Sequence, residues 1–207
     1  MEIQNNKEEV PFSRYLALFE KLDPQEAAAR CGVPFENGCF TLRLLNAEYR
    51  VAWPEYAITA DREDAFALTN LPCQTFLLRY LLEGKQAALS LGYKTFREMP
   101  WGELYITPYT GRCLTRAAFT FGTQVSAFAA ACERMGGEKL SHGDAGYGFA
   151  FLGGYRMQIM IYAGDEEFPP SSQILYSDNF ADGFSAEDRV VAGDILISAI
   201  RQEMKRK

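Results

Sequence analysis

The sequence predicts an α+β protein in which antiparallel β-hairpins or a β-meander pack with about five to six helices, the last of them at the C-terminal end. Segments of alternating apolar and polar residues occur in clusters separated by short turns, and do not alternate one by one with helices. Clustered strands favour an antiparallel sheet, because parallel strands need long crossover connections. Segments with apolar residues three and four positions apart flank these clusters and predict the helices.

Two short helices are expected before residue 33. The apolar face of the first consists of Phe12, Tyr15, Leu16 and Phe19. The second begins at Asp23-Pro24, an N-cap residue followed by proline at the first helical position. It ends before Gly32, where glycine favours a left-handed cap.

A β-meander is expected next. Residues 40–44 and 49–53 alternate apolar with polar side chains, and Asn46-Ala47 is a turn signal between them. A third short strand is expected near residues 56–59. A helix over residues 73–82 is apolar on most of its surface, which predicts a position in the centre of the core.

The second half of the chain mixes both kinds of element. Residues 85–112 contain several glycine and proline breaks, and we expect loops with short strands at 94–97 and 103–106. Helices are expected over 114–121 and 125–132 from their apolar spacing.

A hairpin and a final helix complete the expected elements. Gly153-Gly154 between two alternating segments predicts a tight hairpin turn, because both positions of such a turn need positive φ. A shorter strand is expected at 173–178. The last helix opens at Ser185-Ala186-Glu187-Asp188, close to a capping box, and ends at the basic residues 205–207.

Composition and length exclude several classes of protein. We expect a single domain over residues 1–207, with two lobes divided near residue 90 as the alternative, because no linker or repeat interrupts the chain. A net charge of −6 gives no nucleic-acid footprint, and no apolar run is long enough to cross a membrane. We therefore expect a cytoplasmic protein that binds neither nucleic acid nor membranes.

The chain has few of the side chains that hold metals or act as nucleophiles. Its five cysteines form no C-x-x-C pair, so no iron–sulfur or zinc-knuckle motif is present. His142 is the single histidine, which excludes metal sites built from several histidines. His142 paired with a cysteine and oriented by Asp144 is a weaker catalytic hypothesis.

An acidic segment is the most unusual feature of the sequence. No lysine or arginine lies between Arg156 and Arg189, and this interval contains Asp165, Glu166, Glu167, Asp178, Asp182, Glu187 and Asp188. Three of these acids lie on a turn that continues into Phe168-Pro169-Pro170. Most of them are explained as solvated turn and helix-cap residues. The functional alternative is a ligand or partner surface, or a divalent-cation site.

Two candidate sites follow from this segment and from the aromatic residues. The ligand-binding candidates are Asp165, Glu166, Glu167, Phe168, Tyr176, Tyr105 and Arg112. The metal candidates are Asp165, Glu166 and Asp178, with Asn179 as a neutral ligand; they would hold a cation such as Mg²⁺ or Mn²⁺ that activates a water. Trp101 and Tyr109 could add aromatic walls beside Arg112, although core packing and loop anchoring are the favoured explanation for them.

Several segments together resemble a known family. These are Leu22-Asp23-Pro24, residues 40–53, Phe96-Arg97-Glu98-Met99-Pro100, Gly111-Arg112 and Gly164-Asp165-Glu166-Glu167-Phe168-Pro169-Pro170 with Ile174-Leu175-Tyr176. They resemble proteins of anaerobic bacteria and archaea grouped as domain of unknown function 3786, over about residues 12–200. The resemblance implies a setting in corrinoid and iron–sulfur metabolism. It implies no catalytic residue, and this chain lacks the cysteine-rich segment that some relatives carry.

We therefore expect a non-catalytic protein that binds a small molecule or a protein partner, as an accessory protein in anaerobic metabolism. One alternative is a hydrolase or transferase that uses carboxylates and a divalent metal. The second is a structural protein-interaction module. The sequence names neither a ligand nor a cofactor.

Overall fold

The computed structural model describes residues 9–65, 68, 70–90 and 92–206. Its helices and strands form two antiparallel sheets with helices packed around them, so the expected α+β class is confirmed. The first sheet has the order β1-β2-β3-β4, and the second has the order β5-β9-β8-β7-β6. The described part of the chain contains no helix long and apolar enough to cross a membrane.

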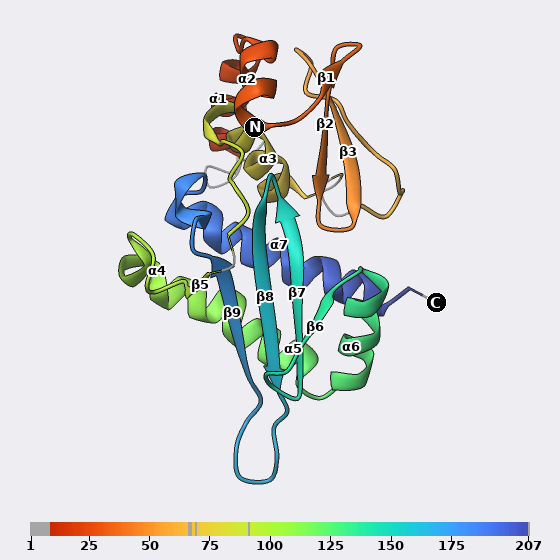
Figure 1. Ribbon diagram of the computed structural model, residues 1–207, viewed down its shortest axis with the longest axis vertical. Coiled ribbons are helices and arrows are strands. Elements are labelled where there is room, and N and C mark those ends of the chain that lie inside the picture. The colour runs from red at the N-terminus through yellow and green to blue at the C-terminus, as the bar shows by residue number, and fades with distance from the viewer. Residues whose placement is uncertain (1–8, 66–67, 69, 91, 207) are drawn as a thin grey trace, which may run out of the picture.

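The first sheet and the helices beside it come from the N-terminal part of the chain (Figure 1). Its strands are β1 (Phe35–Glu36), β2 (Cys39–Leu44), β3 (Ala47–Ala52) and β4 (Ile58–Ala60). The helices are α1 (Glu9–Phe19), α2 (Pro24–Cys31) and α3 (Leu71–Glu83).

The second sheet and the remaining helices follow α3. The strands are β5 (Tyr93–Thr95), β6 (Glu138–Leu140), β7 (Ala145–Leu152), β8 (Tyr155–Tyr162) and β9 (Ser171–Ser177). The helices are α4 (Gly102–Tyr109), the π-helix η2 (Thr110–Thr115), α5 (Arg116–Phe121), α6 (Val125–Arg134), the 3-10 turn η3 (Phe180–Asp182) and α7 (Ala186–Met204).

The helix ends follow from local side-chain chemistry. The Asp23 carboxylate accepts hydrogen bonds from the backbone N–H groups of Gln25 and Glu26 at the start of α2, and Gly32 ends this helix with φ 63°. At the start of α7, Ser185 and Asp188 form a complete capping box. These contacts are local in the chain, which is why the sequence predicts them.

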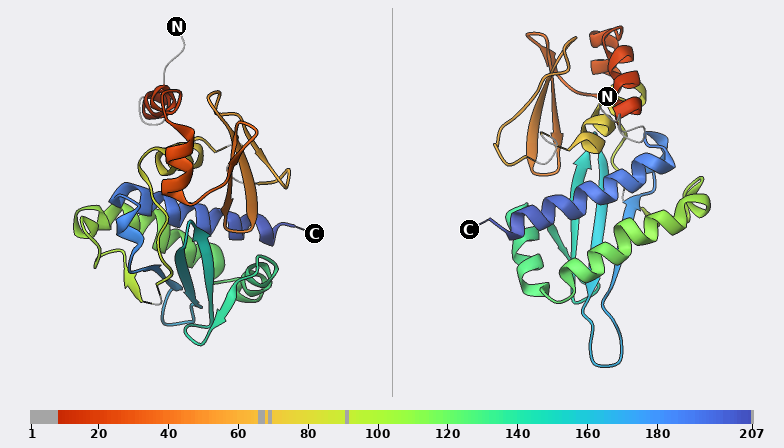
Figure 2. Two further views of the ribbon diagram at one scale, coloured as in Figure 1. Left: turned by 45° about the horizontal axis from the view of Figure 1, so that its top comes forward. Right: turned by 180° about the vertical axis from the view of Figure 1, so that it is seen from behind.

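The second sheet has one covered face and one open face. Phe149, Phe151, Met157 and Ile159 alternate along β7 and β8 and are buried. On this side α7 runs alongside the continuous helix formed by α4, η2 and α5 (Figure 2, right). On the opposite face, no helix of the described residues lies in front of β7, β8 and β9, and Arg156 and Gln158 are only half-buried there (Figure 1).

The two sheets share one continuous apolar core. The backbone N–H of Leu45, in the β2–β3 turn, donates to the Phe151 carbonyl at 2.9 Å. Leu45 has φ 52°, a left-handed conformation that is unfavourable for a leucine. The contact between the sheets therefore fixes this turn.

The region after residue 84 departs from the expected elements. The strand predicted at 103–106 is wrong, because these residues belong to α4. Their side chains suit a strand, but Tyr109 and Cys113 further along the same helix are buried in the core, and this packing overrides the local preference. The strand expected at 94–97 exists in shortened form as β5, and the helix expected from residue 114 is α5 preceded by η2.

The π-helix interrupts an otherwise regular helix. Pro108 lies inside α4, and η2 begins two residues later at Thr110. Proline has no N–H to donate and its ring crowds the carbonyl of the preceding turn, so the hydrogen-bond ladder is broken here. Wide turns of this kind are rare and are frequent at functional sites.

Gly193 lies where α7 packs closely against η2. A Cβ at this position would lie 2.7 Å from Cys113 Sγ and 3.2 Å from Tyr176 Oη. We expect Gly193→Ala to lower the free energy of unfolding by about 1–3 kcal/mol because it overpacks the core. Urea unfolding measures this change.

Gly111→Ala is the matched control. Gly111 is also helical, but a Cβ there would meet no atom within 4 Å. Alanine should therefore stabilise the protein by about 0.5–1 kcal/mol through helix propensity. Equal effects of the two substitutions would contradict the close packing of α7 on η2.

Candidate functional site

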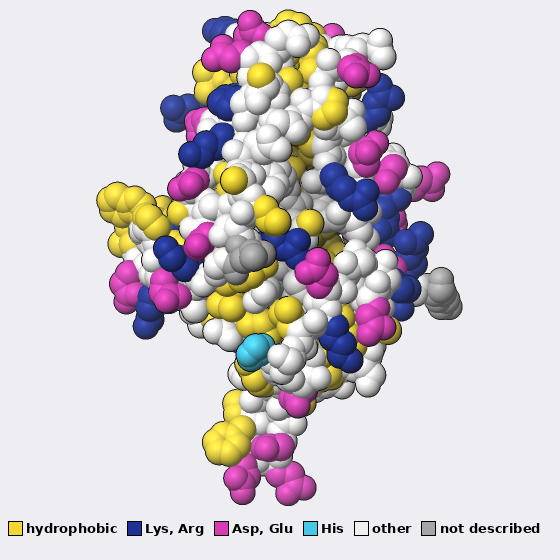
Figure 3. All heavy atoms as spheres, in the orientation of Figure 1, with side chains coloured by type: hydrophobic (Ala, Val, Ile, Leu, Met, Phe, Trp, Pro, Cys, Tyr) yellow, Lys and Arg dark blue, Asp and Glu magenta, His cyan; other side chains and the backbone are white. Residues whose placement is uncertain are grey.

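The acidic turn lies at the tip of the β8–β9 hairpin, which projects from the body of the molecule (Figures 1 and 3). Asp165 Oδ1 accepts hydrogen bonds from the N–H groups of Phe168 at 2.7 Å and Glu167 at 2.9 Å. These bonds, the one from Phe168 first, hold the pKa of Asp165 below its ordinary value. Phe168 is 67% exposed. The turn is thus ordered by its own backbone and exposes its aromatic side chain to solvent.

The other predicted ligand-binding residues lie elsewhere. Tyr176 is fully buried, and its hydroxyl donates to the Arg189 carbonyl at 2.8 Å. Tyr105 lies half-buried on α4, and Arg112 lies on η2. The tip of the hairpin is separated from Tyr176 by most of β9. The structure therefore does not bring the seven predicted residues together in one site.

The predicted metal ligands are also separated. Asp165 and Glu166 precede β9, whereas Asp178 follows it and accepts a hydrogen bond from the Ser90 hydroxyl. Among the described residues, no three histidine, cysteine, aspartate or glutamate side chains are grouped so that they could hold a metal ion. The extended strand between these carboxylates is the physical reason that they do not form one site.

The thiols and His142 do not form a catalytic pair in the described chain. Four of the cysteines are buried, and burial raises the pKa of Cys31 to about 11 and that of Cys113 to about 12. His142 is exposed. Asp144 accepts a hydrogen bond from the Ala163 backbone, so its carboxylate anchors the hairpin arm.

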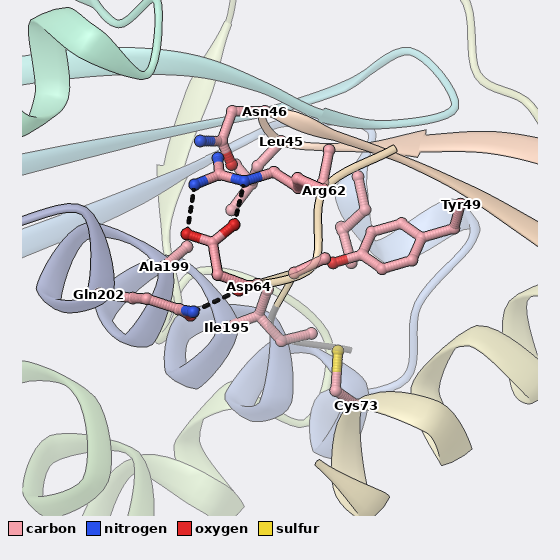
Figure 4. A pocket seen from close by; sticks show the side chains of 12 residues that line it. Leu45, Asn46, Tyr49, Arg62, Asp64, Cys73, Ile195, Ala199 and Gln202 are labelled. Atoms are coloured by element: carbon pink, nitrogen blue, oxygen red, sulfur yellow. Dashed lines mark hydrogen bonds and ion pairs between the residues drawn. The ribbon is translucent and has the colours of Figure 1, made fainter. Parts of the chain in front are cut away.

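A small, partly open cavity lies between the β2–β3 turn and α7 (Figure 4). Its volume is about 20 Å³, which is room for about one water molecule. Arg62 pairs with Asp64 through two hydrogen bonds of 2.6 and 2.8 Å within the loop after β4. Gln202 on α7 donates to the Asp64 carbonyl and joins this loop to α7. The cavity therefore lies at the joint between the first sheet and α7.

Two hollows lie along α7, with volumes of about 570 and 860 Å³. They adjoin each other, since Pro72, Arg112 and Val191 line both. We call the two hollows together the arginine groove. Its cationic residues are Arg14, Arg79, Arg112, Arg116, Arg201 and Lys205.

Positive charge in the arginine groove exceeds negative charge. Asp194 pairs with both Arg112 and Arg116, and Arg116 also donates to the Ser198 hydroxyl at 2.7 Å. In the part of the chain that the structure describes, Arg201 and two other cations, Arg14 and Lys205, form no ion pair. The protein carries a net charge of −6, so this excess is local.

Each side of the arginine groove has a distinct structural origin. Residues on α7 spaced by about one helical turn supply Asp194, Ser198, Arg201 and, just past its end, Lys205. The π-helix supplies Arg112, and α5 supplies Arg116. Arg112 is half exposed, with 50% of its side chain accessible, so its guanidinium can reach a ligand.

Sequence reasoning identified Arg112 and missed the other cations. A signal was present, since the sequence places Asp194, Ser198, Arg201 and Lys205 on one face of the last helix. Such a stripe is typical of an ordinary solvated helix face. Its proximity to Arg112 and Arg116, 78 residues or more away in the chain, depends on how α7 packs.

Comparison with known proteins gives a family and no function. The model of the family described as domain of unknown function (DUF3786) matches residues 23–199. No curated protein and no solved structure matches the chain.

The ion pairs beside the cavity predict how stability depends on pH. Glu203 is 4% exposed and accepts hydrogen bonds from Arg62 and Arg134. Burial raises the pKa of Glu203, but these bonds outweigh it and hold the pKa below its ordinary value of 4.5. The ionised carboxylate therefore stabilises the fold above the ordinary pKa, and this stabilisation is lost as the pH falls through the folded pKa.

We expect Glu203→Gln to lower the free energy of unfolding at pH 7 by about 1–3 kcal/mol, because two charge-assisted hydrogen bonds are weakened. The difference from the parent should shrink as the pH falls below about 4.5. Urea unfolding at pH 7, 5 and 3.5 measures it. Glu36→Gln, at an exposed position, is the control and should change stability by less than about 0.5 kcal/mol. A difference that is constant with pH would contradict the role of this charge.

Proposed function

Because the chain belongs to the DUF3786 family, whose description names no activity, we propose its function from the site itself: a non-catalytic protein that binds a small anion in the arginine groove. The observation that carries the proposal is the excess of cations around one large hollow in an acidic protein. Arginine suits this role because its planar guanidinium donates paired hydrogen bonds to a carboxylate or a phosphate.

The size and shape of the arginine groove support a small ligand. Its two hollows, about 570 and 860 Å³, are comparable with ligand sites, which commonly occupy about 300–1,000 Å³. The π-helical segment that follows Pro108 carries Arg112, which lines both hollows. Segments of this kind are frequent at functional sites, which agrees with a binding role for Arg112.

The polar chemistry of the arginine groove favours binding over catalysis. Ser198 accepts a hydrogen bond from Arg116, so its neighbour is a cation and not a base, and Thr75 donates its hydroxyl to the Leu71 carbonyl at 3.0 Å. Cys113, which follows Arg112 in the chain, is fully buried, and burial raises its pKa to about 12. None of these three groups is prepared to act as a nucleophile at neutral pH.

Inorganic phosphate and citrate are the probes for the proposal. We expect both to bind the parent protein in isothermal titration calorimetry at fixed pH, and more weakly as ionic strength rises, because the cations are partly exposed. The double variant Arg112→Gln with Arg116→Gln should weaken binding about tenfold or more, through the loss of charge-assisted hydrogen bonds.

Two further variants separate loss of binding from loss of fold. Arg201→Gln removes a cation that has no ion-pair partner in the described structure, so it should weaken binding without changing the unfolding midpoint. Arg43→Gln removes an exposed arginine of β2 that does not line the groove, and it should leave binding unchanged. If neither probe binds, or if all three variants bind equally well, the proposed function is wrong.

A further inference from the structure

The two hollows of the arginine groove differ in chemistry. The hollow of about 570 Å³ is lined by Arg112, Arg116, Arg201 and Lys205, with Asp194 as its acidic residue. We call it the cationic half. The hollow of about 860 Å³ has five apolar lining residues, Pro11, Tyr15, Pro72, Phe76 and Val191, and its polar lining residues are Arg14, Thr75, Arg79, Arg112, Glu187 and Asp188. We call it the apolar half.

The charges in the apolar half nearly balance: Arg14, Arg79 and Arg112 line it together with Glu187 and Asp188, and of these cations Arg14 forms no ion pair in the described chain. Arg79 lies 3.1 Å from the Asp188 carboxylate and 3.5 Å from the Glu187 carboxylate, and it donates to the Ser185 hydroxyl at 2.9 Å. The same guanidinium lies over the ring of Tyr15, with its carbon 5.4 Å from the ring centroid. A cation held by two carboxylates has little charge left for an anion. Tyr15 instead presents an ordered aromatic wall.

The cationic half has the opposite balance. Asp194 is shared by Arg112 and Arg116, and this single carboxylate cannot neutralise both. Arg201 and Lys205 add further charge without an ion pair in the described chain. An anionic group is therefore stabilised more in this half than in the other.

The halves meet at three shared residues. Pro72 from α3, Arg112 from η2 and Val191 from α7 line both hollows. Arg112 can therefore bind the charged group of a ligand at the boundary between the halves, while an apolar group attached to it enters the apolar half. One ligand with two chemically different ends fits this arrangement.

We propose that the ligand of the arginine groove is an amphiphilic anion, with a phosphate or carboxylate bound in the cationic half and an aromatic or branched apolar group bound in the apolar half. This inference rests on the anion-binding function proposed above. It adds that Tyr15, Pro72 and Val191 select the uncharged part of the ligand. Binding of the apolar group removes it and the groove walls from water.

Phenyl phosphate and inorganic phosphate test this ligand class, since the first adds a single aromatic ring to the charged group of the second. We expect phenyl phosphate to bind the parent protein about ten- to a hundredfold more tightly in isothermal titration calorimetry at equal pH and ionic strength, as the burial of one such ring permits.

Variants assign each part of the binding to one half. Val191→Thr keeps the shape of the side chain and replaces a methyl group with a hydroxyl, and Tyr15→Ala removes the aromatic wall. Both should reduce the ratio of the affinity for phenyl phosphate to the affinity for inorganic phosphate severalfold. Arg201→Gln should weaken both probes by the same factor. Two independent variants in the apolar half keep the test valid if Tyr15→Ala loosens α1.

The outcomes distinguish this inference from the proposed function. If phosphate binds through Arg201 but phenyl phosphate binds no more tightly, the apolar half has no role and the inference is wrong, while anion binding stands. The inference is also wrong if Val191→Thr and Tyr15→Ala both leave the ratio of affinities unchanged. If neither probe binds the parent protein, both proposals fail.

Discussion

The packing of α7 against the helix formed by α4, η2 and α5 is the contact on which the rest of the structure depends. The approach is close because Gly193 has no side chain where Cys113 Sγ and Tyr176 Oη would collide with one. α7 also contacts α3 and α6, so elements from both parts of the chain meet on it. The same helix forms one wall of the arginine groove and, through Glu203 and Gln202, one wall of the joint with the first sheet.

Charged side chains are distributed unevenly over the structure, and the role of each depends on whether it is buried or exposed. Glu203 is buried and held by arginines, so it stabilises the joint between α7, α6 and the loop after β4. The acids of the hairpin tip are exposed and lie far along β8 and β9 from the groove. Because Asp194 is the one acidic side chain among the described residues that line the cationic half, an acidic protein retains a surface that attracts anions.

Much of the fold follows from local patterns in the sequence. The cap at Asp23, the capping box at Ser185 and the turn at Gly153-Gly154 involve residues a few positions apart, and the structure has all three. The prediction of a strand at 103–106 is wrong because the conformation of these residues depends on distant contacts. They are helical because Tyr109 and Cys113, further along the same helix, are buried against distant elements, and no local pattern reports this burial.

The candidate site shows the same division between local and tertiary information. The sequence by itself determined the fold class, the helix caps, the hairpin and the acidic turn, because each depends on neighbours in the chain. It also marked Arg112, but it could not join this residue to Asp194 and Arg201. Only the tertiary structure decided that Tyr176 is buried, that Asp165 and Asp178 lie at opposite ends of β9, and that the cations of η2, α5 and α7 line one groove. The physical reason is that packing α7 on η2 brings together side chains that are about eighty residues apart, and this proximity leaves no periodic signal in the sequence.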